Sequence, residues 1–137
     1  MQAPSHTEFL LYLDDDADDR EIFQDIFNKV EKDLQLVLLA EGEQVLELLS
    51  HAKITGNIPK LIILDLNMPG IDGREVLRQI RQDSVLSNLP VVIFTTSSSE
   101  MDKAFAAEHR AEFITKPGSV SALKTVIESI IEMASVT

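Results

Sequence analysis

Acidic, hydroxyl and ammonium side chains stand directly after four of the short apolar segments in this sequence. The acidic run Asp14–Asp16 follows the first segment, Asp65 follows another, and Thr95 and Lys116 follow two more. Hard oxygen donors without His or Cys among them favour Mg²⁺, which uses one or two carboxylates and keeps several waters. A Mg²⁺ ion, an ammonium and a hydroxyl donor together neutralise the charge of a phosphoryl group during its transfer. The residue types therefore indicate phosphoryl chemistry, provided that the fold brings these side chains together.

The apolar segments before these residues are typical of strands buried on both faces of a sheet. Four of the five are continuously apolar instead of alternating, which favours a parallel sheet that is covered on both sides. We expect strands at Phe9–Leu13, Leu36–Leu39, Leu61–Leu64, Val91–Phe94 and Ala111–Thr115.

Apolar residues at helical spacing lie between and after these strands. The clearest stripe runs from Leu123 to Ala134, and the segment of about Ser98–His109 is the least apolar. The sequence Ser97-Ser98-Ser99-Glu100 matches a capping box at the start of that segment. Repeated strand-then-helix units predict an α/β fold, a doubly wound parallel sheet with right-handed crossovers and helices on both faces. In such sheets ligands bind beyond the carboxyl ends of the strands, so the polar residues named above should meet at one edge.

The composition limits the class of protein. The chain has 137 residues, 45% of them hydrophobic, which fits a single domain over 1–137 with its core at about 9–134. Its 12 Lys and Arg against 23 Asp and Glu give a formal net charge of −11, which disfavours nucleic acid and an anionic membrane as partners. Cysteine is absent, which excludes disulfides and thiolate metal sites. Met1–Thr7 carries no Lys or Arg and precedes no long apolar run, so we expect no secretory signal and a cytoplasmic protein.

Four motifs occur in the order and spacing of one known family. They are Leu13-Asp14-Asp15, then Asp65-Leu66-Asn67-Met68-Pro69-Gly70-Ile71-Asp72-Gly73, then Thr95, and then Lys116-Pro117. With these motifs the chain resembles the receiver domain of two-component response regulators, specifically the type that consists of a receiver alone. The resemblance implies a flavodoxin-like fold with parallel strands in the order 2-1-3-4-5.

The resemblance also implies a role for each residue of the motifs. Asp65 is similar to the aspartate that accepts the phosphoryl group, and Lys116 to the lysine that pairs with the phosphoryl oxygens. Asp15 resembles a direct Mg²⁺ ligand, and Asp14 resembles a residue that holds the ion mostly through water. Asn67 would contribute its backbone carbonyl to the metal.

Two further residues resemble the switch residues of that family, which change position together. Thr95 is similar to the switch hydroxyl, and Phe113 to the aromatic residue that swings with it. The Lys116–Pro117 peptide bond is expected to be cis. Arg110 and Gly118 depart from the residues often found in the family, Gly and an apolar residue respectively, and these departures concern partner specificity and not phosphorylation.

The implied function is that of a phospho-accepting signalling domain, with self-phosphorylation and autodephosphorylation but no classical enzyme activity. A histidine kinase or histidine phosphotransfer protein would donate the phosphoryl group to Asp65, with Mg²⁺ as the cofactor. The output would be a switched surface that binds a downstream protein, or onward transfer of the phosphoryl group, by a monomer or weak dimer.

Three other readings of the residues are weaker. A phosphohydrolase with an aspartyl nucleophile would need Asp-x-Asp-x-Thr/Val after a strand, and Asp14–Asp18 fails at its last position. A Ca²⁺-binding loop at Asp14–Asp25 lacks Gly at its sixth position and Glu at its twelfth. A receiver-like scaffold that is never phosphorylated would not need the complete set of acids that this chain retains.

Overall fold

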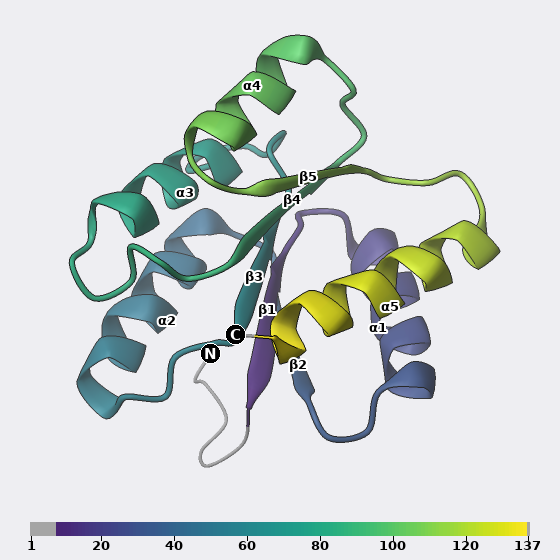
Figure 1. Ribbon diagram of the computed structural model, residues 1–137, viewed down its shortest axis with the longest axis horizontal. Helices are drawn as coiled ribbons and strands as arrows, with labels where there is room; N and C mark the ends of the chain where they lie inside the picture. Colours follow the sequence, from purple (N-terminus) through teal and green to yellow (C-terminus); the bar gives the residue numbers. More distant parts are fainter. Residues whose placement is uncertain (1–7, 137) are drawn as a thin grey trace.

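Strands and helices alternate along the chain in the computed structural model, which describes residues 8–136 (Figure 1). The strands are β1 Phe9–Leu13, β2 Gln35–Leu39, β3 Leu61–Leu64, β4 Val91–Thr95 and β5 Glu112–Thr115. The helices are α1 Ala17–Val30, α2 Gly42–Thr55, α3 Gly73–Gln82, α4 Glu100–Glu108 and α5 Val120–Ser135. Every expected strand is confirmed to within one residue at each end. Met1–Thr7, on which the expectation of no secretory signal rests, lies outside the described residues.

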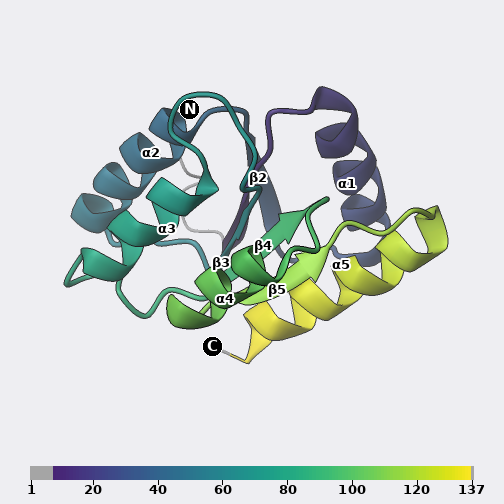
Figure 2. The same ribbon diagram turned by 90° about the horizontal axis from the view of Figure 1, so that it is seen from above.

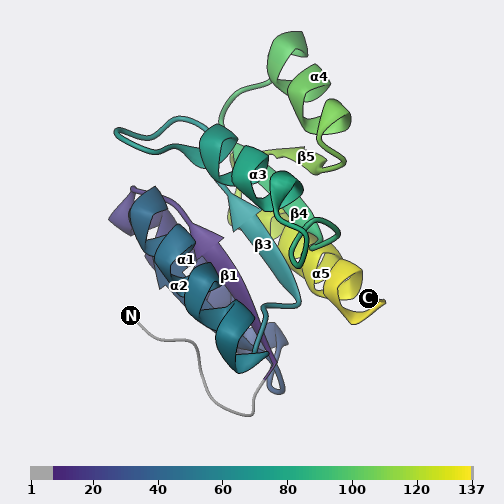
Figure 3. The same cartoon turned by 90° about the vertical axis from the view of Figure 1, so that its left-hand side faces the viewer.

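All strand pairs are parallel, and the sheet has the order β2-β1-β3-β4-β5. Figure 2 shows α1 and α5 on one face of this sheet and α2 and α3 on the other. Figure 3 looks onto α2 and α3 and shows α4 beside the edge strand β5. The predicted doubly wound α/β fold is therefore confirmed. Because the strands are parallel, their carboxyl ends share one edge.

Each face of the sheet has its own apolar core. Leu10, Tyr12 and Ile63 pack with α1 and α5, whereas Leu11 and Leu64 pack with α2 and α3. Neighbouring residues of one strand thus enter different cores, because successive side chains of a strand point to opposite faces. This arrangement explains why the central strands are continuously apolar.

Helix α4 begins two residues later than the capping-box motif indicates. Ser99 is the N-cap residue, and its hydroxyl oxygen accepts a hydrogen bond from the backbone N–H of Asp102 at 3.1 Å. The Ser97 hydroxyl instead donates to the Asp102 carboxylate at 2.7 Å. The predicted capping box at Ser97–Glu100 is wrong because Ser97 takes part in a contact between loop and helix.

The end of α4 places a non-glycine residue in the left-handed region. Arg110 has φ of 58°, and among the described residues no other non-glycine residue has a positive φ. Its N–H donates to Ala107 O at 3.2 Å, and the N–H of Ala111 donates to Ala106 O at 2.9 Å. This pattern is a Schellman motif, whose left-handed position favours glycine. The departure noted at Arg110 thus has a backbone cost.

We expect the variant Arg110→Gly to have a higher free energy of unfolding than Arg110→Ala, by about 1 kcal/mol. Both variants lose the hydrogen bond from the Arg110 guanidinium to Ser87 O, so their difference isolates the backbone. Urea unfolding of the two variants measures this difference. Equal stabilities would show that residue 110 does not hold a left-handed conformation in solution.

Candidate functional site

Two carboxylates and one ammonium meet at the carboxyl edge of the sheet. Asp14 follows β1, Asp65 follows β3 and Lys116 follows β5. The Lys116 Nζ donates to Asp14 Oδ2 at 2.6 Å and to Asp65 Oδ2 at 3.4 Å. Asp14 is fully buried and Asp65 is 6% exposed. The edge of the sheet therefore holds opposite charges that are largely removed from water.

Asp15 completes a group of three carboxylates. One oxygen of each of Asp14, Asp15 and Asp65 lies within 4.8 Å of the other two. Asp15 is exposed while the other two are buried, so the group is open to solvent on one side. Oxygen donors at this separation fit a hard divalent cation such as Mg²⁺. Asn67 stands beside them, and its backbone N–H donates to Asp65 Oδ1 at 3.4 Å.

Thr95 lies on β4, which pairs with β3, and Phe113 lies on the edge strand β5, which pairs with β4. Thr95 ends β4 and is fully buried, and its hydroxyl oxygen accepts a hydrogen bond from the Ser97 N–H at 3.4 Å. The Thr95 carbonyl accepts from the backbone N–H of Lys116 at 2.7 Å, which ties it to the end of β5. Phe113 is half-buried and packs against the apolar core under α2 and α3.

Asp19 and Tyr12 belong to the site although the sequence did not single them out. The carboxylate of Asp19, on the first turn of α1, accepts a hydrogen bond from Lys116 Nζ at 2.9 Å. The Tyr12 hydroxyl donates to Asp14 Oδ2 at 2.6 Å. In the sequence Asp19 belongs to an acidic run at a helix start, where acids are usually solvated, and Tyr12 belongs to an apolar strand segment. The spacing gave no signal for either contact, since both depend on how α1 packs over the end of β1.

Burial and charge shift the proton equilibria of this site in opposite directions. Burial raises the pKa of Asp65 above its ordinary value, against the lowering effect of the nearby Lys116 charge, and the Asp14 charge raises it further. Burial alone would lower the pKa of Lys116, but its hydrogen bonds to Asp14 and Asp19 outweigh that effect and raise it. Lys116 is therefore charged at neutral pH, and one lysine faces three carboxylates.

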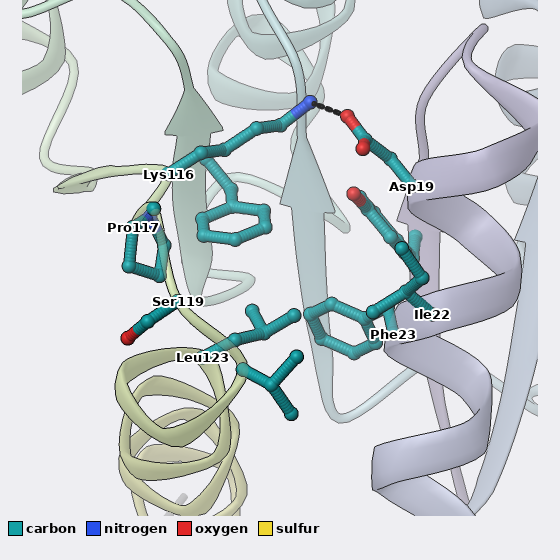
Figure 4. Close-up of a pocket in the computed structure, with 11 residues that line it drawn as sticks. Asp19, Ile22, Phe23, Lys116, Pro117, Ser119 and Leu123 are labelled. Atoms are coloured by element: carbon teal, nitrogen blue, oxygen red, sulfur yellow. Dashed lines mark hydrogen bonds and ion pairs between the residues drawn. The ribbon is translucent and has the colours of Figure 1, made fainter.

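A pocket opens beside the lysine, between the first turns of α1 and the start of α5. It has a volume of about 180 Å³. Figure 4 shows Lys116 reaching across its upper rim to Asp19, with Ile22, Phe23 and Leu123 forming the apolar wall below. The carboxylates at the edge of the sheet thus have an apolar hollow as their neighbour.

A family model described as a response regulator receiver domain matches residues 10–128. The chain belongs to the response regulator receiver family. Among curated proteins it is similar to the response regulator Rcp1 of Synechocystis sp. (strain ATCC 27184 / PCC 6803 / Kazusa). The two are 33% identical over 124 residues, which are 88% of this chain and 84% of Rcp1. In five further relatives the match covers 15% to 62% of the relative's own length.

Solved structures of response regulators share the fold of this receiver domain. The phosphorylated cyanobacterial phytochrome response regulator RcpA has a TM-score of 0.83 and 29% identity, with 92% of each chain covered. The Mn²⁺-bound form of Rcp1 has a TM-score of 0.79 and 31% identity, with 90% of this chain and 91% of that chain covered. Among residues 8–136 no helix is long and apolar enough to cross a membrane.

The peptide bond between Lys116 and Pro117 is not cis in this receiver domain, since residues 8–136 contain no cis peptide bond. The expectation of a cis bond is therefore wrong. Lys116 reaches Asp14, Asp19 and Asp65 with this bond in the trans form, which an X–Pro bond intrinsically prefers by about 0.5–1 kcal/mol.

We expect Asp65→Asn to raise the free energy of unfolding of the receiver domain at pH 7, on the order of 1 kcal/mol. The folded-state pKa of Asp65 lies above its unfolded value, so the folded protein favours the protonated carboxyl. The wild type therefore loses stability as the pH rises through that folded pKa, whereas the neutral amide does not. Lys116 keeps two carboxylate partners in the variant.

Unfolding of both proteins between pH 4 and pH 8, without metal, measures this effect, and the advantage of Asp65→Asn should shrink towards the acid end. Asp83→Asn is the control of opposite sign, because the hydrogen bond from Lys53 lowers the pKa of Asp83. A loss of stability in Asp65→Asn at pH 7 would contradict the assignment of a raised pKa.

Proposed function

We propose that this receiver domain accepts a phosphoryl group on Asp65 in a reaction that requires Mg²⁺. The observation that carries the proposal is the position of the Asp65 carboxylate. It is 6% exposed, lies 3.4 Å from the Lys116 ammonium, and shares a group of carboxylate oxygens within 4.8 Å with Asp14 and Asp15. A nucleophile, a fixed cation and a set of metal ligands are thereby within reach of one incoming group.

The proposed step forms one bond and breaks one. A carboxylate oxygen of Asp65 attacks phosphorus, and the bond from phosphorus to the donor breaks, so that the donor leaves with the electron pair. With a phosphohistidine donor the leaving group is an imidazole nitrogen, and with acetyl phosphate it is acetate. Lys116 Nζ is placed to move from the carboxylates to a phosphoryl oxygen, where its charge stabilises the transferred group.

Asp14, Asp15, Asp65 and the Asn67 carbonyl would hold the Mg²⁺ ion. When bound, the ion offsets the negative charge that the phosphoryl group and the carboxylates bring together. Asp14 Oδ2 already accepts hydrogen bonds from Tyr12 and Lys116, and its Oδ1 accepts from the Asp16 N–H at 2.9 Å. These bonds favour contact between Asp14 and the ion through water. The Mn²⁺-bound form of Rcp1 supports a divalent ion in a related protein.

The proposed donor is a histidine kinase or a histidine phosphotransfer protein, as the family membership favours. Thr95 and Phe113 are the proposed switch residues, which would move when the acyl phosphate adds its charge and acceptor oxygens. The output would be altered binding of a downstream protein or onward transfer of the phosphoryl group. The phosphorylated form of RcpA supports such chemistry in a related response regulator.

Incubation with acetyl phosphate and Mg²⁺, followed by intact-protein mass spectrometry, tests the proposal. We expect one added phosphoryl group that is stable in acid and labile in base. Asp65→Asn should remove the label completely, because an amide cannot form the acyl phosphate. Chelation of the metal should prevent labelling of the wild type.

Asp18→Asn is the matched control. Asp18 is an exposed acid in the first turn of α1, and it lies outside the group formed by Asp14, Asp15 and Asp65. This variant should be labelled like the wild type. Label that persists in Asp65→Asn would refute Asp65 as the acceptor. Turnover of unrelated phosphoesters at enzyme-like rates would favour a phosphohydrolase instead.

A further inference from the structure

One buried carboxylate joins three segments around the proposed phosphorylation site. Arg74 Nη2 donates to Asp102 Oδ1 at 2.7 Å, and Ser97 Oγ donates to Asp102 Oδ2 at 2.7 Å. Asp102 is 9% exposed. We call this set of Arg74, Asp102 and Ser97 the Asp102 bridge. It connects the start of α3, the first turn of α4 and the loop that follows β4.

The arginine end of the Asp102 bridge is fixed next to Asp65. Arg74 Nη1 donates to Leu66 O at 3.3 Å, and the Arg74 N–H donates to the N-cap residue Asp72 at 3.0 Å. Arg74 directly follows Gly73, which lies against the Asp65 backbone. This end of the bridge is therefore held beside the Asp65–Leu66 backbone.

The serine end is connected to the proposed switch residue. The Ser97 N–H donates to the Thr95 hydroxyl oxygen at 3.4 Å, and the Ser97 carbonyl accepts from the Thr115 hydroxyl at 3.0 Å. The Ser97 hydroxyl oxygen also accepts from the Ser99 N–H at 3.2 Å. A movement of Thr95 towards Asp65 would move Ser97 as well, and with it the contact to Asp102.

The apolar packing of helix α4 is limited to Ala106, which lies in the core under α2 and α3, and the half-buried Phe105. Of its residues Glu100–Glu108, the buried ones are Asp102 and Ala106, and Met101 is 81% exposed. Hydrogen bonds to a charged group are roughly twice as strong as those between neutral groups. The Asp102 bridge is therefore a principal tie between α4 and the rest of the site.

We propose that Asp102 is a positioning residue for the phosphorylation of Asp65: held by Arg74, it holds Ser97 and thereby keeps Thr95 in the arrangement described above. The proposal rests on the proposed function, since it concerns the movement of Thr95 towards the phosphoryl group. If the Asp102 bridge forms in the described arrangement of Thr95 and breaks in the other, it stabilises the described arrangement relative to the other by the free energy of the bridge. Given the movement of Thr95 that the proposed function includes, loss of the bridge raises the population in which Thr95 has moved towards Asp65.

The test measures the rate of phosphoryl uptake from acetyl phosphate in wild type, Asp102→Ala, Arg74→Met and the double variant. If uptake proceeds from the population in which Thr95 faces Asp65, the rate follows that population. We expect about a tenfold faster rate in Asp102→Ala, which corresponds to a shift of about 1.4 kcal/mol. Arg74→Met should act in the same direction, and the double variant should be no faster than Asp102→Ala, because both changes break one bridge.

Two further measurements separate positioning from a loss of fold. Mg²⁺ affinity should stay at the wild-type value, and Asp102→Asn, which can still accept from Ser97, should give an intermediate rate. Glu100→Gln is the matched control, because it removes an exposed carboxylate from the same turn of α4. Its rate should equal that of the wild type.

Amide hydrogen exchange at Ser97 provides a readout that does not depend on phosphorylation. Exchange should become faster in Asp102→Ala and in Arg74→Met. If the wild type takes up label and Asp102→Ala takes it up at the same or a lower rate, the positioning role is overturned. If the wild type takes up no label while exchange rises in the variants, the proposed function fails and the bridge stands as the tie that holds Ser97.

Discussion

Lys116→Met is expected to lower the free energy of unfolding by about 3–5 kcal/mol at pH 7, the range found when one member of a buried ion pair is removed. Lys116 Nζ lies within hydrogen-bond distance of Asp14, Asp19 and Asp65, and its side chain is 11% exposed. Methionine retains much of the length and apolar surface of the stem but leaves three carboxylates without their cation. Their mutual repulsion is then opposed by the Tyr12 hydroxyl, which donates to Asp14, and by the Arg20 guanidinium, which reaches only the backbone carbonyl of Asp14 at 2.7 Å.

The pH dependence of this loss follows from the direction of the pKa shift. The folded-state pKa of Lys116 is raised, so its contribution to stability is complete below its unfolded pKa and is lost only in strongly alkaline solution. At neutral pH the whole effect should therefore appear in urea unfolding. Acidification should reduce the difference in free energy of unfolding between the wild type and Lys116→Met, because the carboxylates become protonated. Added Mg²⁺ should restore part of the lost stability of the variant, because the ion replaces the missing charge.

Lys53→Met is the matched control for Lys116→Met. Lys53 pairs with Asp83 at 2.5 Å, but its side chain is 35% exposed and it meets one carboxylate instead of three. Solvent-exposed pairs contribute little to stability, so this substitution should have a much smaller effect. Equal losses in the two variants would show that the carboxylates at the edge of the sheet do not depend on Lys116.

Gly73→Ala is expected to cost about 2–3 kcal/mol of stability and to abolish phosphoryl uptake, although Gly73 makes no side-chain contact. A Cβ at Gly73 would lie 2.1 Å from the carbonyl oxygen of Asp65 and 2.9 Å from its carbonyl carbon. That backbone cannot easily retreat, because the Asp65 N–H donates to Leu13 O at 3.1 Å. Either α3 moves outward, or the carboxylate of Asp65 moves away from Asp14, Asp15 and Lys116.

Gly118→Ala separates this steric effect from the general cost of replacing a glycine. A Cβ at Gly118 meets no atom within 4 Å, and the residue lies only two positions after Lys116. We expect it to unfold and to take up label like the wild type. A Gly73→Ala protein with wild-type stability and labelling would mean that α3 can shift without disturbing Asp65.

The sequence predicts which charged residues meet at this site, because their meeting follows from the topology of the sheet. Asp14, Asp65 and Lys116 each come directly after a strand, and parallel strands end at one edge, so their meeting needs no knowledge of side-chain packing. The roles given to Asp65, Asn67, Thr95 and Phe113 rest on the family motifs and stay predictions, and the labelling experiment tests the role of Asp65.

Contacts that depend on packing between elements could not be predicted in the same way. The contact of Asp19 with Lys116 joins residues 97 positions apart, and the Arg74–Asp102 pair spans 28 positions. Such contacts depend on the angle at which α1 and α4 lie against the sheet. The same contacts explain why the capping box predicted at Ser97–Glu100 is wrong. The Ser97 hydroxyl donates to the side chain of Asp102, and Ser99 caps the helix instead. Local patterns identify the elements but not the polar contacts between them.

The hydroxyl of Tyr12 has a consequence for spectroscopy. The chain contains one tyrosine and no tryptophan, so one phenol dominates its near-ultraviolet absorption and its intrinsic fluorescence. That phenol is fully buried, packs against Phe23 with ring centroids 4.5 Å apart, and donates a hydrogen bond to Asp14. Any event that changes the charge around Asp14 therefore changes the surroundings of this single chromophore. The receiver domain carries a built-in optical reporter at its own acidic site, and no label has to be attached.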